Sequence, residues 1–188
     1  MIFLNKFDNK ENIRFSSFKK TLQICEERKL KNIVETGTSR GKTKFFFFKK
    51  INWKDGMSTI MFAEYAKFIN GKLHTCDISE KNIKNAKKFT LELNNYINFY
   101  IDDSINFLKN FKEKIDLLYL DSLDGHDPIE ASKHQLKEAE FSIDKLNLNS
   151  LVLLDDKGAK TNLSIDFYKK NGFKVVNETN NQILFSKI

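Results

Sequence analysis

Asn32-Ile33-Val34-Glu35-Thr36-Gly37-Thr38-Ser39-Arg40-Gly41 joins a short apolar run to two glycines. The first five residues, 32–36, predict a buried β-strand, and the glycines predict a tight turn directly after it. Because glycine has no Cβ atom, Gly37 and Gly41 let the backbone turn sharply and approach a ligand closely. A strand that ends in such a turn is typical of α/β folds in which ligands bind at the carboxyl edge of a parallel sheet.

Strand and helix patterns alternate along most of the remaining chain. This alternation predicts an α/β fold with a doubly wound, Rossmann-like sheet that is mostly parallel and covered by helices on both faces. The last two strands have the spacing of an antiparallel hairpin. The predicted helices span residues 16–30, 57–69, 79–93, 129–145 and 162–170, with a short one ending at Phe111. The predicted strands span residues 32–36, 72–77, 97–101, 115–120, 150–154, 173–177 and 182–187.

The length of 188 residues suits one domain, which we expect to span residues 1–188 with an N-terminal helical segment over residues 1–30. No apolar stretch has the length of a signal peptide core or a membrane span. Cys25 and Cys76 lie far apart in apolar contexts, which predicts buried free thiols in a reducing compartment. We therefore expect a cytoplasmic protein without a membrane partner. The sequence leaves open whether the protein forms a homo-oligomer.

The formal net charge of +7 allows two interpretations. A basic surface could bind nucleic acid or another anionic partner. Alternatively, the charge belongs to solvated helix faces, which the mixing of lysines with acidic residues favours. Arg14, Arg28 and Arg40 are the only arginines, so nearly all of the positive charge is lysine.

Polar residues recur where successive predicted strands end. Because the carboxyl ends of parallel strands meet at one edge of a sheet, these residues are expected to surround one binding site. A carboxylate on the second strand can accept hydrogen bonds from both hydroxyls of a ribose. The residues at the strand ends are Glu35, Asp77, Asp102, Asp103, Ser104, Asp121, Asp155 and Asp156.

The order and spacing of these motifs resemble those of class I S-adenosylmethionine-dependent methyltransferases. Residues 33–41 look like the first motif of that superfamily, Asp77 matches its ribose-binding acid, and residues 102–104 resemble its adenine-side motif. The resemblance implies the strand order 3-2-1-4-5-7-6, with the terminal hairpin reversed. It also implies that S-adenosylmethionine is bound by Glu35, Gly37, Thr38, Ser39, Gly41, Ser58, Asp77, Ile78, Asp103, Ser104 and Asp121.

Residues 42–55 depart from the superfamily pattern, because the glycine turn normally leads directly into a helix. This insertion holds a run of four phenylalanines, residues 45–48, and Trp53, and we predict a loop here. The aromatic side chains could form a lid over the ligand, or they could be packing residues beneath a long loop.

Asp121, Asp155 and Asp156 form a second candidate site. Oxygen ligands suit Mg²⁺, and metal-dependent O-methyltransferases, which this chain resembles, place acids at the same two strand ends. A metal there would bind substrate hydroxyls and lower their pKa. Alternatively, the three carboxylates are solvated strand ends or cap helices.

Asp124-Gly125-His126-Asp127 resembles the loop after the fourth strand in related bacterial methyltransferases. We predict catalytic roles for His126, as a general base, and for Asp124, although a lone loop histidine is often simply exposed. His74 and His134 are expected to be structural.

These features predict methyl transfer to a hydroxyl of a small sugar or phenol-like molecule, with Mg²⁺ assistance as an option. The acceptor would lie among the loops over residues 38–56, 122–129 and 157–161. An RNA-directed methyltransferase or RNA-binding protein is a second hypothesis, disfavoured because no recognised RNA motif is present. A third hypothesis is a cofactor-binding protein without catalysis, or a nicotinamide oxidoreductase. The oxidoreductase is disfavoured because the turn lacks the three-glycine spacing of nicotinamide-binding folds.

Overall fold

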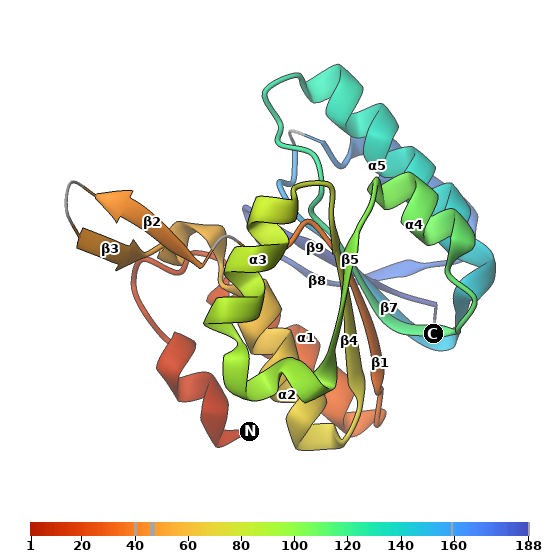
Figure 1. The fold of residues 1–188 in the computed structure, drawn as a ribbon. Coiled ribbons are helices and arrows are strands. Elements are labelled where there is room, and N and C mark those ends of the chain that lie inside the picture. The colour runs from red at the N-terminus through yellow and green to blue at the C-terminus, as the bar shows by residue number, and fades with distance from the viewer. Residues whose placement is uncertain (40, 46–47, 159, 188) are drawn as a thin grey trace.

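Seven strands form the central sheet of the computed structural model, in the order β5-β4-β1-β6-β7-β9-β8 (Figure 1). The first five strands in this order are parallel, and β9 is antiparallel to both of its neighbours. The predicted order with a reversed terminal hairpin is confirmed. The strands are β1 (Asn32–Thr36), β4 (Lys72–Asp77), β5 (Ile97–Ile101), β6 (Ile115–Leu120), β7 (Leu146–Leu154), β8 (Lys174–Glu178) and β9 (Ile183–Ser186).

The structure describes residues 1–39, 41–45, 48–158 and 160–187, apart from the side chains of residues 42–45, 48–50 and 55. Helices α1 (Phe15–Glu27), α2 (Ser58–Ile69) and α3 (Glu80–Phe89) lie on one side of the sheet. Helices α4 (Ser104–Asn110), α5 (Pro128–Ser142) and α6 (Asn162–Lys170) lie on the other. Short 3₁₀ helices are η1 (Ile2–Phe7), η2 (Trp53–Asp55), η3 (Leu91–Tyr96) and η4 (Ile143–Lys145).

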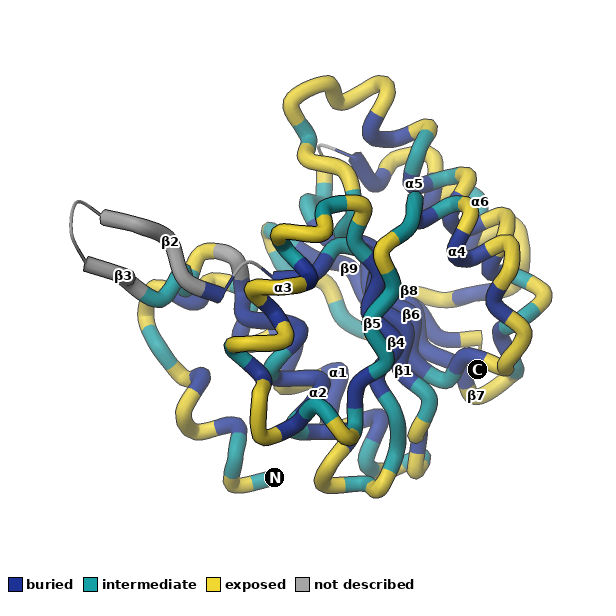
Figure 2. Tube along the Cα trace, viewed as in Figure 1, coloured by how far each residue is buried: buried dark blue, intermediate teal, exposed yellow. Residues whose placement is uncertain are grey.

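Alternating side chains of the central strands supply two apolar cores, one on each face of the sheet. The central strands run through the buried interior, which is dark blue in Figure 2. Ile33 packs in the core with α1 and α2, whereas Val34 packs in the core with α4, α5 and α6. Neighbouring residues separate in this way because side chains of a strand point to opposite faces. Burial on both faces of the central strand β6 explains why residues 115–120 read as an apolar run interrupted only by Asp116.

The largest differences from the predicted bounds lie in one strand and one helix. Strand β7 begins at Leu146 rather than at residue 150, and its pairing with β6 shifts between Ile115 and Leu117. The residues of this irregularity, 147–149, are largely exposed and polar, so they lacked an apolar strand pattern. The helix expected over residues 79–93 divides into α3 and η3 at Thr90, whose hydroxyl bonds back to the Ala86 carbonyl.

The prediction of a loop after the glycine turn, over residues 42–55, is wrong for two short segments that form strands. β2 (Lys42–Phe45) and β3 (Phe48–Ile51) pair as an antiparallel hairpin separate from the main sheet. Trp53 packs against the α1–α2 core, which supports the packing interpretation for this residue. The side chains of the phenylalanine run lie outside the described residues, so the choice between lid and packing stays a prediction for them.

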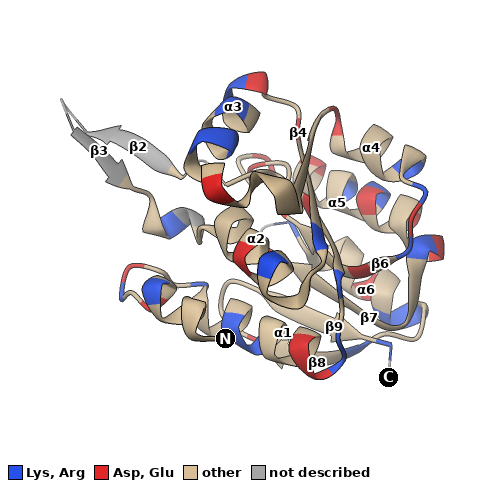
Figure 3. Ribbon diagram, turned by 60° about the horizontal axis from the view of Figure 1, so that its bottom comes forward, with Lys and Arg blue, Asp and Glu red and all other residues tan. Residues whose placement is uncertain are grey.

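Other composition-based expectations concern cysteines, charge and membranes. Cys25 and Cys76 are free and buried, as predicted. Basic and acidic residues are interspersed over the helices in Figure 3, as the solvated-surface interpretation predicts. Among the described residues, no helix is long and apolar enough to cross a bilayer.

Candidate functional site

Two adjoining cavities lie at the carboxyl ends of the parallel strands, where a ligand of an open α/β sheet is expected. Their volumes are about 420 and 110 Å³. Gly37, Asp77, Ile78 and Ser122 line both. The larger cavity is also lined by Arg14, Thr38, Ser39, Lys54, Ser79, Asn82, Asp121, Asp124 and Asp156. The smaller one is also lined by Cys76, Asp103, Ser104, Leu123 and His134.

Gly37 brings β1 and β6 into close contact at the floor of these cavities. Its φ of +84° lies in the left-handed region, and a Cβ atom there would lie 2.1 Å from the Asp121 carbonyl oxygen. Only glycine fits such a position. The following residue, Thr38, donates its backbone N–H to Asp77 Oδ2 at 3.2 Å, so the turn and the end of β4 are tied together.

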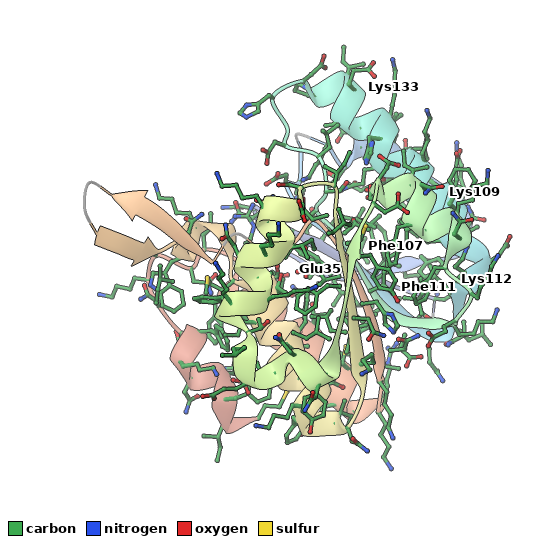
Figure 4. All side chains as sticks on the ribbon, in the orientation of Figure 1. Glu35, Phe107, Lys109, Phe111, Lys112 and Lys133 are labelled. Carbon is green, nitrogen blue, oxygen red and sulfur yellow. The ribbon has the colours of Figure 1, made fainter. Side chains whose placement is uncertain are left out.

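Glu35 lies beneath the turn rather than in the cavities (Figure 4). Its carboxylate is fully buried and accepts hydrogen bonds from the hydroxyls of Ser58 at 2.6 Å, Thr59 at 2.8 Å and Thr75 at 2.6 Å. Thr59 also accepts from the backbone N–H of Ser39 at 2.8 Å. Glu35 and Ser58 therefore support the turn from below, in contrast to the ligand contacts predicted for them.

Asp77 lies at the junction of the two cavities. Its Oδ1 accepts the Ser79 backbone N–H at 2.8 Å, and the Asn82 amide spans both carboxylate oxygens at 3.2 and 3.1 Å. These bonds hold the carboxylate toward the cavities, as the assignment to a ribose requires. Ile78, the next residue, is 74% exposed and offers an apolar surface to both cavities.

The smaller cavity has the polar groups predicted for the adenine side. Asp103 caps α4 by accepting the backbone N–H groups of Ile105 and Asn106. Ser104 Oγ lies 2.9 Å from His134 Nε2, so α4 and α5 meet at this cavity. Burial raises the pKa of the neighbouring Cys76 to about 12, which keeps its thiol neutral.

The predicted metal ligands Asp121, Asp155 and Asp156 do gather, and one oxygen from each lies within 4.8 Å of the others. Asp121 and Asp156 line the larger cavity, whereas Asp155 is fully buried behind it. Burial and the charge of Asp155 raise the pKa of Asp121 well above its usual range, and the adjacent Lys160 opposes this rise. Burial also raises the pKa of Tyr119, whose hydroxyl donates to Asp121 Oδ2 at 3.2 Å.

Two cationic side chains already bind these carboxylates. Arg14 Nε lies 2.7 and 2.8 Å from the two oxygens of Asp155, and Arg14 Nη2 lies 2.7 Å from Asp156 Oδ1. Lys160 Nζ lies 2.7 Å from Asp121 Oδ1 and 3.1 Å from Asp156 Oδ2. The oxygens that a divalent ion would coordinate therefore bind protein cations instead, and this arrangement does not fit a magnesium site.

The two predicted catalytic residues and Gly41 occupy different places. Asp124 is exposed and lines the larger cavity, whereas His126 lies in the same loop and lines neither of the two. Gly41 also lies outside both cavities, at the base of the β2–β3 hairpin, where its carbonyl accepts the Asn52 N–H. The remaining predicted ligand residues line the cavities as described above.

Arg14, Lys160 and His134 were missed as site residues. His134 was expected to be structural, and it lines the smaller cavity instead. A weak signal existed for Arg14, since a rare arginine in a lysine-rich chain suits bidentate carboxylate binding. Lys160 follows its partner Asp156 by four residues, which is a weak local signal, whereas its other partner Asp121 is 39 residues away. His74 is buried against Tyr100 and Phe111 and is structural, as expected.

Comparisons with known proteins concern the family and the fold of the chain. A family described as a methyltransferase domain matches residues 34–157. A sequence comparison with curated proteins finds no match.

Solved structures of similar fold include several methyltransferases. An SAH-bound methyltransferase from Podospora anserina has a TM-score of 0.66 at 14% identity, over 90% of this chain and 77% of that chain. The O-methyltransferase NovP has a TM-score of 0.63 at 9% identity, over 93% and 79%. An rRNA methylase from Streptococcus thermophilus has a TM-score of 0.60 at 14% identity, over 90% and 95%. The sheet order agrees with the fold of these structures, and the match over residues 34–157 shows that the chain belongs to the methyltransferase-domain family.

Proposed function

We propose that this protein transfers the methyl group of S-adenosylmethionine to a hydroxyl group of a small molecule. The observation that carries this proposal is the position of Asp77 between two adjoining cavities of different character. The smaller cavity has the size and polar edge for an adenine. The larger cavity has room for the rest of the cofactor and for an acceptor.

The binding residues divide the cofactor between these cavities. Ser104 and His134 offer polar atoms to the adenine, and exposed Ile78 offers an apolar face to its ring. Asp77 accepts from the ribose hydroxyls in place of the Asn82 amide, which now spans both carboxylate oxygens. The turn over residues 37–39 holds the methionyl part, supported from below by the Glu35 hydroxyl network.

When bound, S-adenosylmethionine supplies an already activated sulfonium methyl, so the protein mainly has to orient the acceptor and exclude water. Asp121 and Asp124 line the larger cavity and are placed to orient an acceptor hydroxyl. Asp121, with its raised pKa, is also suited to accept a proton from it. Magnesium assistance does not belong to this proposal, because Arg14 and Lys160 bind the carboxylates that would hold the ion.

The first test is calorimetric titration of the protein with S-adenosylmethionine and S-adenosylhomocysteine. We expect one site per chain, and no heat of binding at millimolar cofactor would refute the proposal. The acceptor class is tested by following S-adenosylhomocysteine release with panels of sugars, phenols, amines and ribosomal RNA. Turnover with hydroxylated small molecules supports the proposal, whereas turnover with RNA or amines alone contradicts the hydroxyl acceptor.

A further inference from the structure

Five of the six carboxylate oxygens of Asp121, Asp155 and Asp156 accept a hydrogen bond from a side chain, and the sixth, Asp156 Oδ2, forms an ion pair. Arg14 serves both oxygens of Asp155 and one of Asp156. Lys160 serves the other oxygen of Asp156 and one of Asp121, and the Tyr119 hydroxyl serves the last. All of these donors come from side chains of this chain, so the cluster is satisfied without an ion.

Lys160 takes the position that a bound cation would have among these carboxylates. Its side chain is 2% exposed, and its Nζ lies within 3.1 Å of oxygens from both Asp121 and Asp156. The ammonium also donates to the Leu123 carbonyl at 3.0 Å. It thus forms two hydrogen bonds, to Asp121 and Leu123, and an ion pair with Asp156. The charges of Asp121 and Asp156 raise the pKa of Lys160, which therefore stays protonated.

Arg14 closes the cluster from the N-terminal segment of the chain. It precedes α1, and its guanidinium side chain is 13% exposed. Besides its bonds to Asp155 and Asp156, its Nη1 donates to the Lys54 carbonyl at 2.8 Å. Arg14 thus connects the N-terminal segment, the insertion and the cluster. Displacing it by a metal would leave a charged group unpaired in a largely buried place, which is unfavourable.

We propose that Arg14 and Lys160 replace a divalent cation at this cluster, so that the site is metal-independent. This inference adds to the proposed methyltransferase function. It rests on that function only in the part that concerns methyl transfer. Three carboxylates facing two cations leave a small residual negative charge, and this is less attractive to Mg²⁺ than three unpaired carboxylates. Arg14 and Lys160 are positioning residues, since they hold Asp121 and Asp156 in the wall of the cavity.

The direct test is a titration of the wild-type protein with Mn²⁺, followed by the electron paramagnetic resonance signal of the free ion. Mn²⁺ is chosen because it accepts the same oxygen ligands as Mg²⁺. We expect no saturable loss of free signal up to about 1 mM, the weak end of the affinities of oxygen-ligand divalent-cation sites, with and without S-adenosylhomocysteine. Saturable Mn²⁺ binding below this concentration would overturn the proposal if the substitution Asp155→Asn abolishes it. This test does not depend on whether variants of Arg14 or Lys160 fold.

A charge variant tests the role of Lys160 itself. Lys160→Met keeps the length of the side chain and removes the ammonium, so we expect Mn²⁺ binding to appear and to raise the melting temperature. Adding Asp156→Asn should remove the gained binding. The matched control is Lys157→Met, three residues earlier, because Lys157 pairs with Glu178 outside the cluster. A folded Lys160→Met protein that binds no more Mn²⁺ than this control contradicts the assignment.

Activity supplies a separate result. Once an acceptor is found, the rate of the EDTA-treated protein is expected to equal the untreated rate, and restoration by Mg²⁺ would overturn metal independence. If no acceptor is methylated, the proposed function fails, but the Mn²⁺ titrations still decide the inference.

Discussion

Arg14 Nε lies 2.7 Å from Asp155 Oδ1, although the two residues are 141 positions apart in the sequence. The Asp155 side chain is 1% exposed, so its charge depends on this guanidinium. The pair connects the segment before α1 to the carboxyl end of β7, next to the larger cavity.

Arg14→Ala is therefore expected to lower the free energy of unfolding by about 3–5 kcal/mol, because it leaves a buried carboxylate without its partner. Urea denaturation measures this change. Lys133→Ala is the control, since Lys133 forms an exposed pair with Glu130, and its loss should cost less than about 1 kcal/mol. Equal effects of the two substitutions would show that the Arg14 pair is not a structural support.

Gly37→Ala should abolish cofactor binding and lower stability strongly. The added methyl group would lie 2.1 Å from the Asp121 carbonyl oxygen, so the turn or β6 must move. Gly172→Ala is a matched control, because its φ of +83° is almost the same and an added Cβ atom would meet no described atom within 4 Å. The control should lose only the backbone cost of about 1–2 kcal/mol. Calorimetry and thermal unfolding of both variants separate the steric clash from the backbone cost, and equal losses would contradict the role of close approach.

Asp77→Ala should weaken S-adenosylmethionine binding about 10- to 100-fold, since hydrogen bonds to a charged acceptor are lost. Isothermal titration calorimetry measures the affinity. Glu80→Gln removes a carboxylate three residues later that forms an exposed pair with Lys84, and its affinity should match the wild type. Unchanged affinity in Asp77→Ala would remove Asp77 from the binding site.

Acid should destabilise the protein partly through His74. Burial lowers the pKa of His74 in the folded state, so the unfolded chain takes up the proton first as the pH falls. The stability is expected to be full above about pH 6.5 and to decrease below it. His74→Gln should flatten this part of the profile of unfolding free energy against pH. A slope that persists unchanged in His74→Gln would assign the acid sensitivity to other groups.

Local patterns were sufficient for most of the scaffold. Strands β1, β4, β5 and β6 have the predicted bounds, because short segments rich in apolar, aromatic or β-branched residues, and the turns that follow them, are visible in short windows. Asp77, Asp103 and Asp121 could be assigned to one edge for the same reason, since parallel strands carry their ends to one side. The β2–β3 hairpin was not foreseen, because its short lysine-rich strands show no clear alternation.

The amino-acid order thus determined the sheet, its direction and the edge where a ligand binds, since these follow from periodicities of a few residues. Only the folded chain decided what each strand-end carboxylate does. Glu35 proved to be a buried support because three hydroxyls from α2 and β4 converge on it. The cluster that resembled a metal site proved to bind Arg14 and Lys160. Such partners come together through long-range packing, and no short window of sequence contains that information.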